Sequence, residues 1–192
     1  MRIDRVVTNI TTLGPGNRLG IWVNGCSRGC KGCVSENLQP VVLSTEGRIE
    51  DFLEGFNFKK IDGVTISGGE PFEQIKELKK LIEFLRNQQI EDILVYTGYT
   101  LDELIKKNNK DITYILDNIA VLIDGPYVLE LDDQKHNLKG STNQKIHYFK
   151  SEYEEKYNEF ISNVRCMQEF ELANILLGVG IPTKEYIDNF RK

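Results

Sequence analysis

Short apolar runs separated by longer amphipathic stretches organise the chain between residues 19 and 149. Runs of four or five apolar residues bounded by glycine, proline, asparagine or aspartate are typical of buried strands. The pattern predicts five strands, at Leu19–Val23, Gly63–Ser67, Ile93–Tyr96, Ala120–Ile123 and Lys145–Phe149.

The segments between these runs carry the signals of helices. From Phe72 to Arg86, apolar residues recur every three or four positions among lysines and glutamates, which predicts an amphipathic helix. Thr100 and Glu103 have the spacing of a capping box, which predicts a helix from Leu101. Alternating strands and helices predict an α/β fold with a mostly parallel sheet buried on both faces, in a single domain over residues 1–192.

Residues 150–192 are expected to form a C-terminal helical extension of that domain. Ser151 and Glu154 have capping-box spacing, and an apolar stripe predicts a helix from Ser151 to Phe170. The apolar run Ile175–Val179 and a helix led by Pro182 are expected to follow. Cys166 falls nearly opposite the stripe, which favours a surface thiol.

Composition narrows the class of protein. The chain has 192 residues, 40% hydrophobic and 28% charged, with a net charge of −5, which argues against a general nucleic-acid or membrane-surface binder. No signal peptide and no run of roughly 18 apolar residues is seen, and three of the four cysteines lie within eight positions. We therefore expect a cytoplasmic protein whose thiols are reduced and available to a metal.

Polar or glycine-bearing residues follow four of the predicted strands. They are the cysteine loop, the turn Ser67–Pro71, Thr97-Gly98 and Asp124-Gly125. Ligands of open α/β sheets bind at the carboxyl ends of the strands, so these segments are expected to meet in one pocket.

Cys26, Cys30 and Cys33 have the spacing CxxxCxxC. Three thiolates leave one iron of a four-iron cubane cluster without a protein ligand, whereas electron carriers usually supply four cysteines. A structural zinc site is the alternative, but it needs a fourth ligand, and His136 and His147 lie far along the chain. The turn Gly68–Pro71 has two interpretations. It is either a plain connection between a strand and a helix, or a binding site that offers backbone amides and a carboxylate to a zwitterionic ligand.

Together, the CxxxCxxC loop after one strand and Gly-Gly-Glu-Pro after the next resemble the radical S-adenosylmethionine (SAM) superfamily. Within it, the chain looks like the activating enzymes of anaerobic (class III) ribonucleotide reductases. The blocks that carry this likeness are Gly14–Arg18, Asn24–Cys26, Tyr96–Tyr99 with Leu101–Leu104, Val121–Gly125 and Gly140–Gln144. Many relatives in the wider group of activating enzymes have an aromatic residue just before the third cysteine, where this chain has Gly32, a residue that the reductase-activating branch also tolerates.

The resemblance implies a partial (β/α) barrel of radical SAM type. It implies that Cys26, Cys30 and Cys33 hold a catalytic [4Fe-4S] cluster whose open iron binds SAM. Other residues are expected to contact the cosubstrate: Gly68, Gly69 and Glu70 at its methionine end, Gly32 and Val34 alongside it, and Thr97 and Asp124 near its ammonium or ribose.

The implied reaction is reductive cleavage of SAM to a 5′-deoxyadenosyl radical, which makes a glycyl radical on a partner enzyme. The expected partners are a large glycyl-radical enzyme, foremost anaerobic ribonucleotide reductase, and an electron donor of flavodoxin or ferredoxin type. Two alternatives stay open: the same chemistry on another protein, peptide or small molecule, and a non-catalytic iron–sulfur or zinc module.

Overall fold

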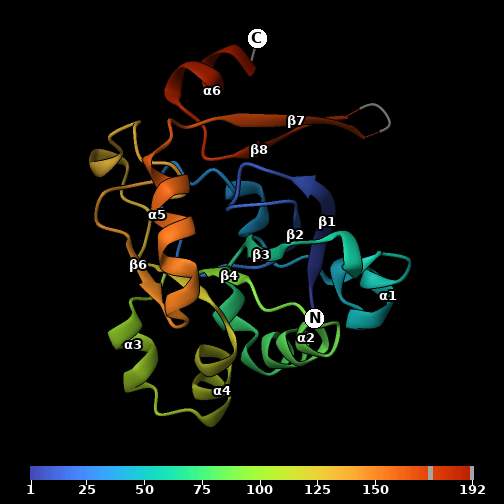
Figure 1. Cartoon of the computed structure of the whole chain (residues 1–192). Helices are drawn as coiled ribbons and strands as arrows, with labels where there is room; N and C mark the ends of the chain where they lie inside the picture. The colour runs from blue at the N-terminus through green and yellow to red at the C-terminus, as the bar shows by residue number, and fades with distance from the viewer. Residues whose placement is uncertain (173–174, 191–192) are drawn as a thin grey trace.

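A six-stranded sheet forms the centre of the computed structural model, which describes residues 1–172 and 175–190 (Figure 1). The strands lie side by side in chain order, with the four central strands parallel and the two edge strands antiparallel to their neighbours. They are β1 (Ile3–Ile10), β2 (Arg18–Val23), β3 (Gly63–Gly68), β4 (Ile93–Tyr96), β5 (Val121–Asp124) and β6 (Lys145–Tyr148). The predicted mostly parallel α/β fold is confirmed; closure toward a barrel stays a prediction.

All five predicted strands are present, but the edge strand β1 was not predicted. Its pairing with β2 shifts register between Ile3 and Arg5 and again between Val7 and Ile10. These irregularities break the alternation of apolar and polar positions by which a strand is recognised.

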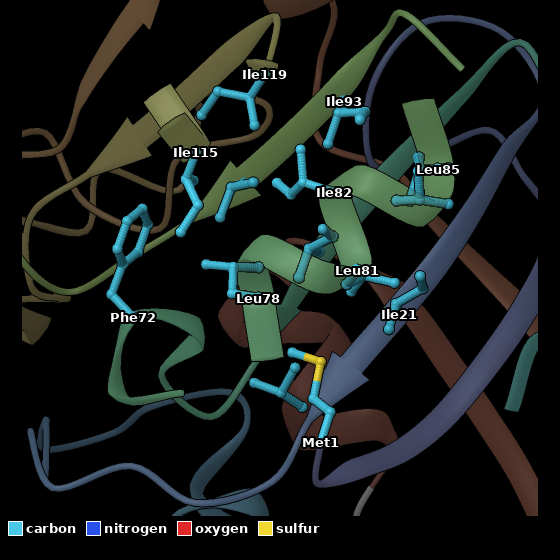
Figure 2. Packing of buried hydrophobic residues seen from close by; sticks show 14 of the residues in the cluster. Met1, Ile21, Phe72, Leu78, Leu81, Ile82, Leu85, Ile93, Ile115 and Ile119 are labelled. Atoms are coloured by element: carbon cyan, nitrogen blue, oxygen red, sulfur yellow. The ribbon is translucent and has the colours of Figure 1, made fainter. Parts of the chain in front are cut away.

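Four α-helices accompany β1–β6: α1 (Ile49–Leu53), α2 (Ile75–Asn87), α3 (Leu101–Lys106) and α4 (Lys110–Asn118). In Figure 2, Leu78, Ile82 and Leu85 of α2 lie among side chains from the sheet and α4. The predicted capping box at Thr100 and Glu103 is confirmed. Short 3-10 turns lie at Glu36–Leu38, Leu43–Thr45, Phe58–Lys60, Pro71–Glu73, Leu129–Leu131 and Ser151–Tyr153.

The C-terminal segment differs from the single helix predicted over residues 151–170. A 3-10 turn precedes α5 (Glu154–Ser162), and no side chain of the predicted Ser151/Glu154 pair caps that helix. The chain then forms an antiparallel hairpin of β7 (Met167–Leu172) and β8 (Ile175–Gly180), followed by α6 (Lys184–Phe190). The prediction was wrong because Met167, Phe170 and Leu172 also suit a strand that pairs with β8. The extension is therefore a hairpin flanked by helices.

The extension packs on the main sheet as part of the core. Tyr157 of α5 is fully buried among Leu94, Val121 and Ile123, while Val179 of β8 joins a cluster with β1. In Figure 1 the hairpin lies on the far side of the sheet from α2 and α4. Both faces of the sheet are thus covered, as predicted. No helix in the described part of the chain is long and apolar enough to cross a membrane.

A buried ion pair joins this extension to the sheet. The guanidinium of Arg18 lies 3.1 Å from Asp92 Oδ2, and both side chains are at most 1% exposed. Arg18 also donates to Thr65 Oγ1 at 2.7 Å, and the Tyr157 hydroxyl donates to Asp92 Oδ1 at 2.6 Å. Burial alone would raise the pKa of Asp92, but Arg18, together with Lys156 and Tyr157, lowers it below the ordinary aspartate value.

Candidate active site

The carboxyl ends of β2, β3 and β4 meet at one open cavity of about 490 Å³. All three clustered cysteines line it, so the structure brings together the two sequence motifs. The other predicted site residues among its lining are Gly32, Val34, Gly68, Gly69, Glu70 and Thr97.

Acidic and amide side chains next to the glycine turn hold the cysteine loop in place. Glu73 Oε1 accepts hydrogen bonds from the backbone N–H and the hydroxyl of Ser27, at 2.9 and 2.5 Å. The Gln74 amide donates to the carbonyl oxygen of Asn24 at 3.3 Å. The buried Asn24 side chain in turn bonds Pro40 and Val42. Sequence reasoning missed these anchors, since their only signal is two polar residues following the glycine turn.

The glycine turn packs directly on the start of the cysteine loop. The Gly69 N–H donates to the Val23 carbonyl at 2.7 Å, and the Glu70 N–H donates to the Gly25 carbonyl at 2.9 Å. A Cβ atom on Gly69 would lie 2.3 Å from that Gly25 oxygen, a separation that real structures do not tolerate. Glycine at this position therefore permits the two motifs to touch.

Replacing Gly69 by alanine is expected to push the cysteine loop away from the turn. Relief of the clash requires backbone movement, which we expect to cost about 1–3 kcal/mol of stability and to lower the iron bound after reconstitution. Thermal unfolding and iron per chain measure the two effects. Gly55→Ala is the control, because a Cβ there meets no atom within 4 Å and only its φ of +84° opposes the change. Equal iron content in both variants would contradict this interpretation.

Glu70 connects the glycine turn to the end of β4. Its Oε1 accepts from the Phe72 N–H at 2.9 Å and the Thr97 hydroxyl at 2.8 Å, and its Oε2 accepts from the Gly98 N–H at 2.7 Å. Burial raises the pKa of Glu70 above its ordinary value, although these three donors oppose the rise. Glu70 and Thr97 thus form one buried unit at the cavity wall.

Asp124 ends β5 but is not among the residues that line the cavity, whereas the following Gly125 is. Its buried carboxylate accepts from the Leu101 N–H at 2.6 Å and the Lys145 N–H at 3.2 Å. His147 Nε2 lies 2.9 Å from Asp124 Oδ2. In the structure Asp124 thus ties the start of α3 to β6, and a contact with a cosubstrate stays a prediction.

Gly32 adopts a left-handed backbone conformation, with φ of +75°. Residues other than glycine rarely adopt this conformation, which gives a physical reason for glycine at this position. A Cβ there would lie 3.7 Å from the ring of Tyr127 and 3.4 Å from Leu129. The loop after β5 therefore lies against the cysteine loop. Val34, on the other side of Cys33, is 63% exposed.

The three clustered thiols are free to act as ligands of a cluster. Cys26, Cys30 and Cys33 are half-buried and free, and in the described residues no three histidine, cysteine or acidic side chains converge as ligands of one ion. Each thiolate of a cubane binds a different iron, so the thiols surround the cluster and need not meet at a single ion. Burial raises the pKa of the Cys26 and Cys33 thiols. The backbone N–H of Arg28 opposes the rise at Cys26, and that of Ser35 opposes it at Cys33.

Comparison with known proteins supports this reading of the cysteines. The sequence profile of a family described as a 4Fe-4S single cluster domain matches residues 12–147. The chain is also 34% identical to the anaerobic ribonucleoside-triphosphate reductase-activating protein of Escherichia coli K12, over 71% of this chain and 92% of that protein. The chain belongs to this family of reductase-activating proteins.

Other members of the family show similar likeness. The reductase-activating protein of Haemophilus influenzae is 34% identical over 71% of this chain and 91% of its own length. That of enterobacteria phage T4 is 28% identical over 76% of this chain and 93% of its own length. The family profile ends before α5, the hairpin and α6. Ten described residues of that C-terminal part, between Met167 and Ile187, nevertheless line the cavity, a feature that sequence reasoning missed.

Proposed function

We propose that this protein is a radical SAM enzyme that generates a glycyl radical on anaerobic ribonucleotide reductase. Cys26, Cys30 and Cys33 would hold a [4Fe-4S] cluster with one iron open to the amino and carboxylate groups of SAM. The observation that carries the proposal is that the three thiols and residues Gly68, Gly69 and Glu70 of the glycine turn line one cavity. The radical SAM form of the partial barrel is part of the same proposal.

The chain's own residues would bind and orient the cosubstrate. Backbone groups of Gly68 and Gly69 would take its methionine end, and the carboxylate of Glu70 would favour the ammonium group nearby. Thr97 would fix the Glu70 carboxylate through the hydrogen bond described above. Gly32 and Val34 would lie alongside SAM. Asp124, which ties the start of α3 to β6, would act near the ammonium or ribose of SAM.

The cavity walls would also exclude water and hold the reactants in line. When bound at Cys26, Cys30 and Cys33, the cluster would supply the electron that splits SAM into methionine and a 5′-deoxyadenosyl radical, and that radical would take a hydrogen atom from the Cα of a partner glycine. The electron would come from a flavodoxin or ferredoxin. No acid–base pair of side chains is needed for this chemistry.

The test uses anaerobically reconstituted protein with SAM and dithionite. We expect release of 5′-deoxyadenosine and methionine, and, with the reductase present, a glycyl-radical signal in its electron paramagnetic resonance (EPR) spectrum. A protein that binds iron but releases neither product would be a non-catalytic iron–sulfur module. Release of 5′-deoxyadenosine without any glycyl radical would disprove the reductase as partner.

A second candidate is the same chemistry on a different protein, peptide or small molecule. The cavity wall that lies outside the family profile favours it, because this wall could select a different substrate. Comparing the cognate reductase with candidate peptides in the same assay separates the two functions.

A further inference from the structure

The C-terminal hairpin and α6 contribute a largely apolar wall to the cavity that holds the cysteines. Met167 comes from β7, Leu177 and Val179 from β8, and Tyr186 from α6. These residues lie beyond the family profile, which ends at residue 147. The extension is therefore built into the cavity and does not stand apart from it.

The end of β1 holds the hairpin through both polar and apolar contacts. The Thr12 hydroxyl donates to the Val179 carbonyl at 2.9 Å in a buried hydrogen bond. The Gln168 side chain accepts from the Thr11 N–H at 3.0 Å and donates to the Asn9 carbonyl at 2.8 Å. Val179 itself is 2% exposed. The wall thus has a fixed position on the sheet.

Arg165 ties this wall to the loop that follows β5. Its side chain is 1% exposed and lies 2.8 Å from Asp132 Oδ1. The guanidinium also donates to the carbonyls of Pro182 at 3.2 Å, His136 at 3.0 Å and Lys139 at 2.8 Å. A buried arginine that donates hydrogen bonds to several backbone carbonyls holds the segments around it in place.

The same connection continues to the cysteine loop. Asp132 Oδ2 accepts from the Tyr127 hydroxyl at 3.1 Å, and the Tyr127 ring lies beside Gly32. A continuous set of contacts therefore runs from Pro182 through Arg165, Asp132 and Tyr127 to the residue before Cys33. Movement of Arg165 would disturb two walls of the cavity together.

We propose that Arg165 is a positioning residue, and that the hairpin and α6 form the wall that confines the radical to its intended substrate. This inference rests on the proposed function. A carbon radical takes hydrogen from whichever donor reaches it, so the walls around it decide how often cleavage of SAM yields a glycyl radical. Loosening the wall should uncouple the two events while the cysteines still bind iron.

The experiment compares Arg165→Met with Arg48→Met, an exposed arginine paired with Asp51 on the surface. In the reconstituted proteins, we expect the ratio of 5′-deoxyadenosine released to glycyl radical formed to rise about tenfold in Arg165→Met only. Iron per chain should be the same in both variants. Thr12→Val removes one hydrogen bond to the hairpin and should raise the ratio by a smaller factor. This milder variant replaces Arg165→Met in the comparison if Arg165→Met fails to fold.

A second measurement needs neither cluster nor partner. In metal-free protein carrying Cys166→Ala, a bulky maleimide reports the access of Cys26, Cys30 and Cys33. We expect labelling several-fold faster with Arg165→Met than with Arg48→Met. Equal labelling rates in the Arg165→Met and Arg48→Met proteins would overturn the role of Arg165. The same holds if 5′-deoxyadenosine and glycyl radical both decrease in Arg165→Met while their ratio stays unchanged. If no protein cleaves SAM, the proposed function fails, while the labelling rates still test the wall.

Discussion

Replacing Cys30 by alanine is expected to abolish SAM cleavage, with 5′-deoxyadenosine falling to background. The remaining two thiolates would leave two irons of a cubane without a protein ligand, so the cluster would be lost or converted to another form. The measurements are iron and sulfide per chain, the EPR spectrum after reduction, and product release. Cys26→Ala and Cys33→Ala should behave alike, because all three thiols line the same cavity.

Cys166→Ala is the matched control for this experiment. Cys166 is exposed and lies outside the cavity lining. We expect wild-type iron content and wild-type product release from this variant. If Cys30→Ala kept a cubane cluster and full turnover, or if Cys166→Ala lost both, the assignment of the cluster ligands would be wrong.

Replacing Asp92 by asparagine is expected to have the largest effect on folding. The change leaves the guanidinium of Arg18 buried without its countercharge, which typically costs about 3–5 kcal/mol. It also weakens the attachment of α5, because Lys156 lies 2.8 Å from Asp92 and Tyr157 donates to it. Chemical denaturation of both proteins measures the difference in the free energy of unfolding.

The neighbouring Glu91→Gln provides the control. Glu91 is 51% exposed and pairs with Arg86 and with Lys150 at the surface. Exposed ion pairs contribute about 0–1 kcal/mol, so this variant should remain near the wild type. If the two variants lost equal stability, burial of the Arg18–Asp92 pair would not explain the effect.

Acid should remove the contribution of Asp92. Because its folded pKa lies below the ordinary value of 3.8, the carboxylate stabilises the fold fully above that pH. The contribution is lost as the pH falls through the lower folded pKa. The stability difference between wild type and Asp92→Asn should therefore be constant near neutral pH and shrink below about pH 4.

Local patterns were sufficient to predict the parallel part of the sheet and the meeting of the motifs. The predicted parallel strands are short, mainly apolar runs, and the glycine turn comes directly at the end of one of them. Both signals are local, so sequence reasoning could use them. Arg18 lies in one of the blocks that carry the resemblance, and the structure shows that it belongs to the buried network with Asp92.

The parts that were missed depend on contacts between distant residues. Met167–Leu172 forms a strand because it pairs with β8, whereas the helical stripe that begins at Tyr153 and includes Met167 gave the wrong prediction of a helix as far as Phe170. In the sequence, Arg165 cannot be distinguished from an ordinary surface arginine. The structure shows that its guanidinium donates to the carbonyls of His136, Lys139 and Gly140. Glu70 belongs to a motif that the sequence shows, but only the structure shows the hydrogen bonds that its carboxylate accepts from Thr97 and Gly98.

The most direct test of the account is whether SAM binds the open iron of a cluster held by three cysteines. We expect electron–nuclear double resonance of the reduced protein to detect coupling from ¹⁵N in the amino group and ¹⁷O in the carboxylate of labelled SAM. Loss of both couplings on adding excess unlabelled SAM would show that the labelled atoms occupy that site. A reduced cluster that shows neither coupling at saturating SAM, or one whose four irons all carry protein ligands, would contradict the account.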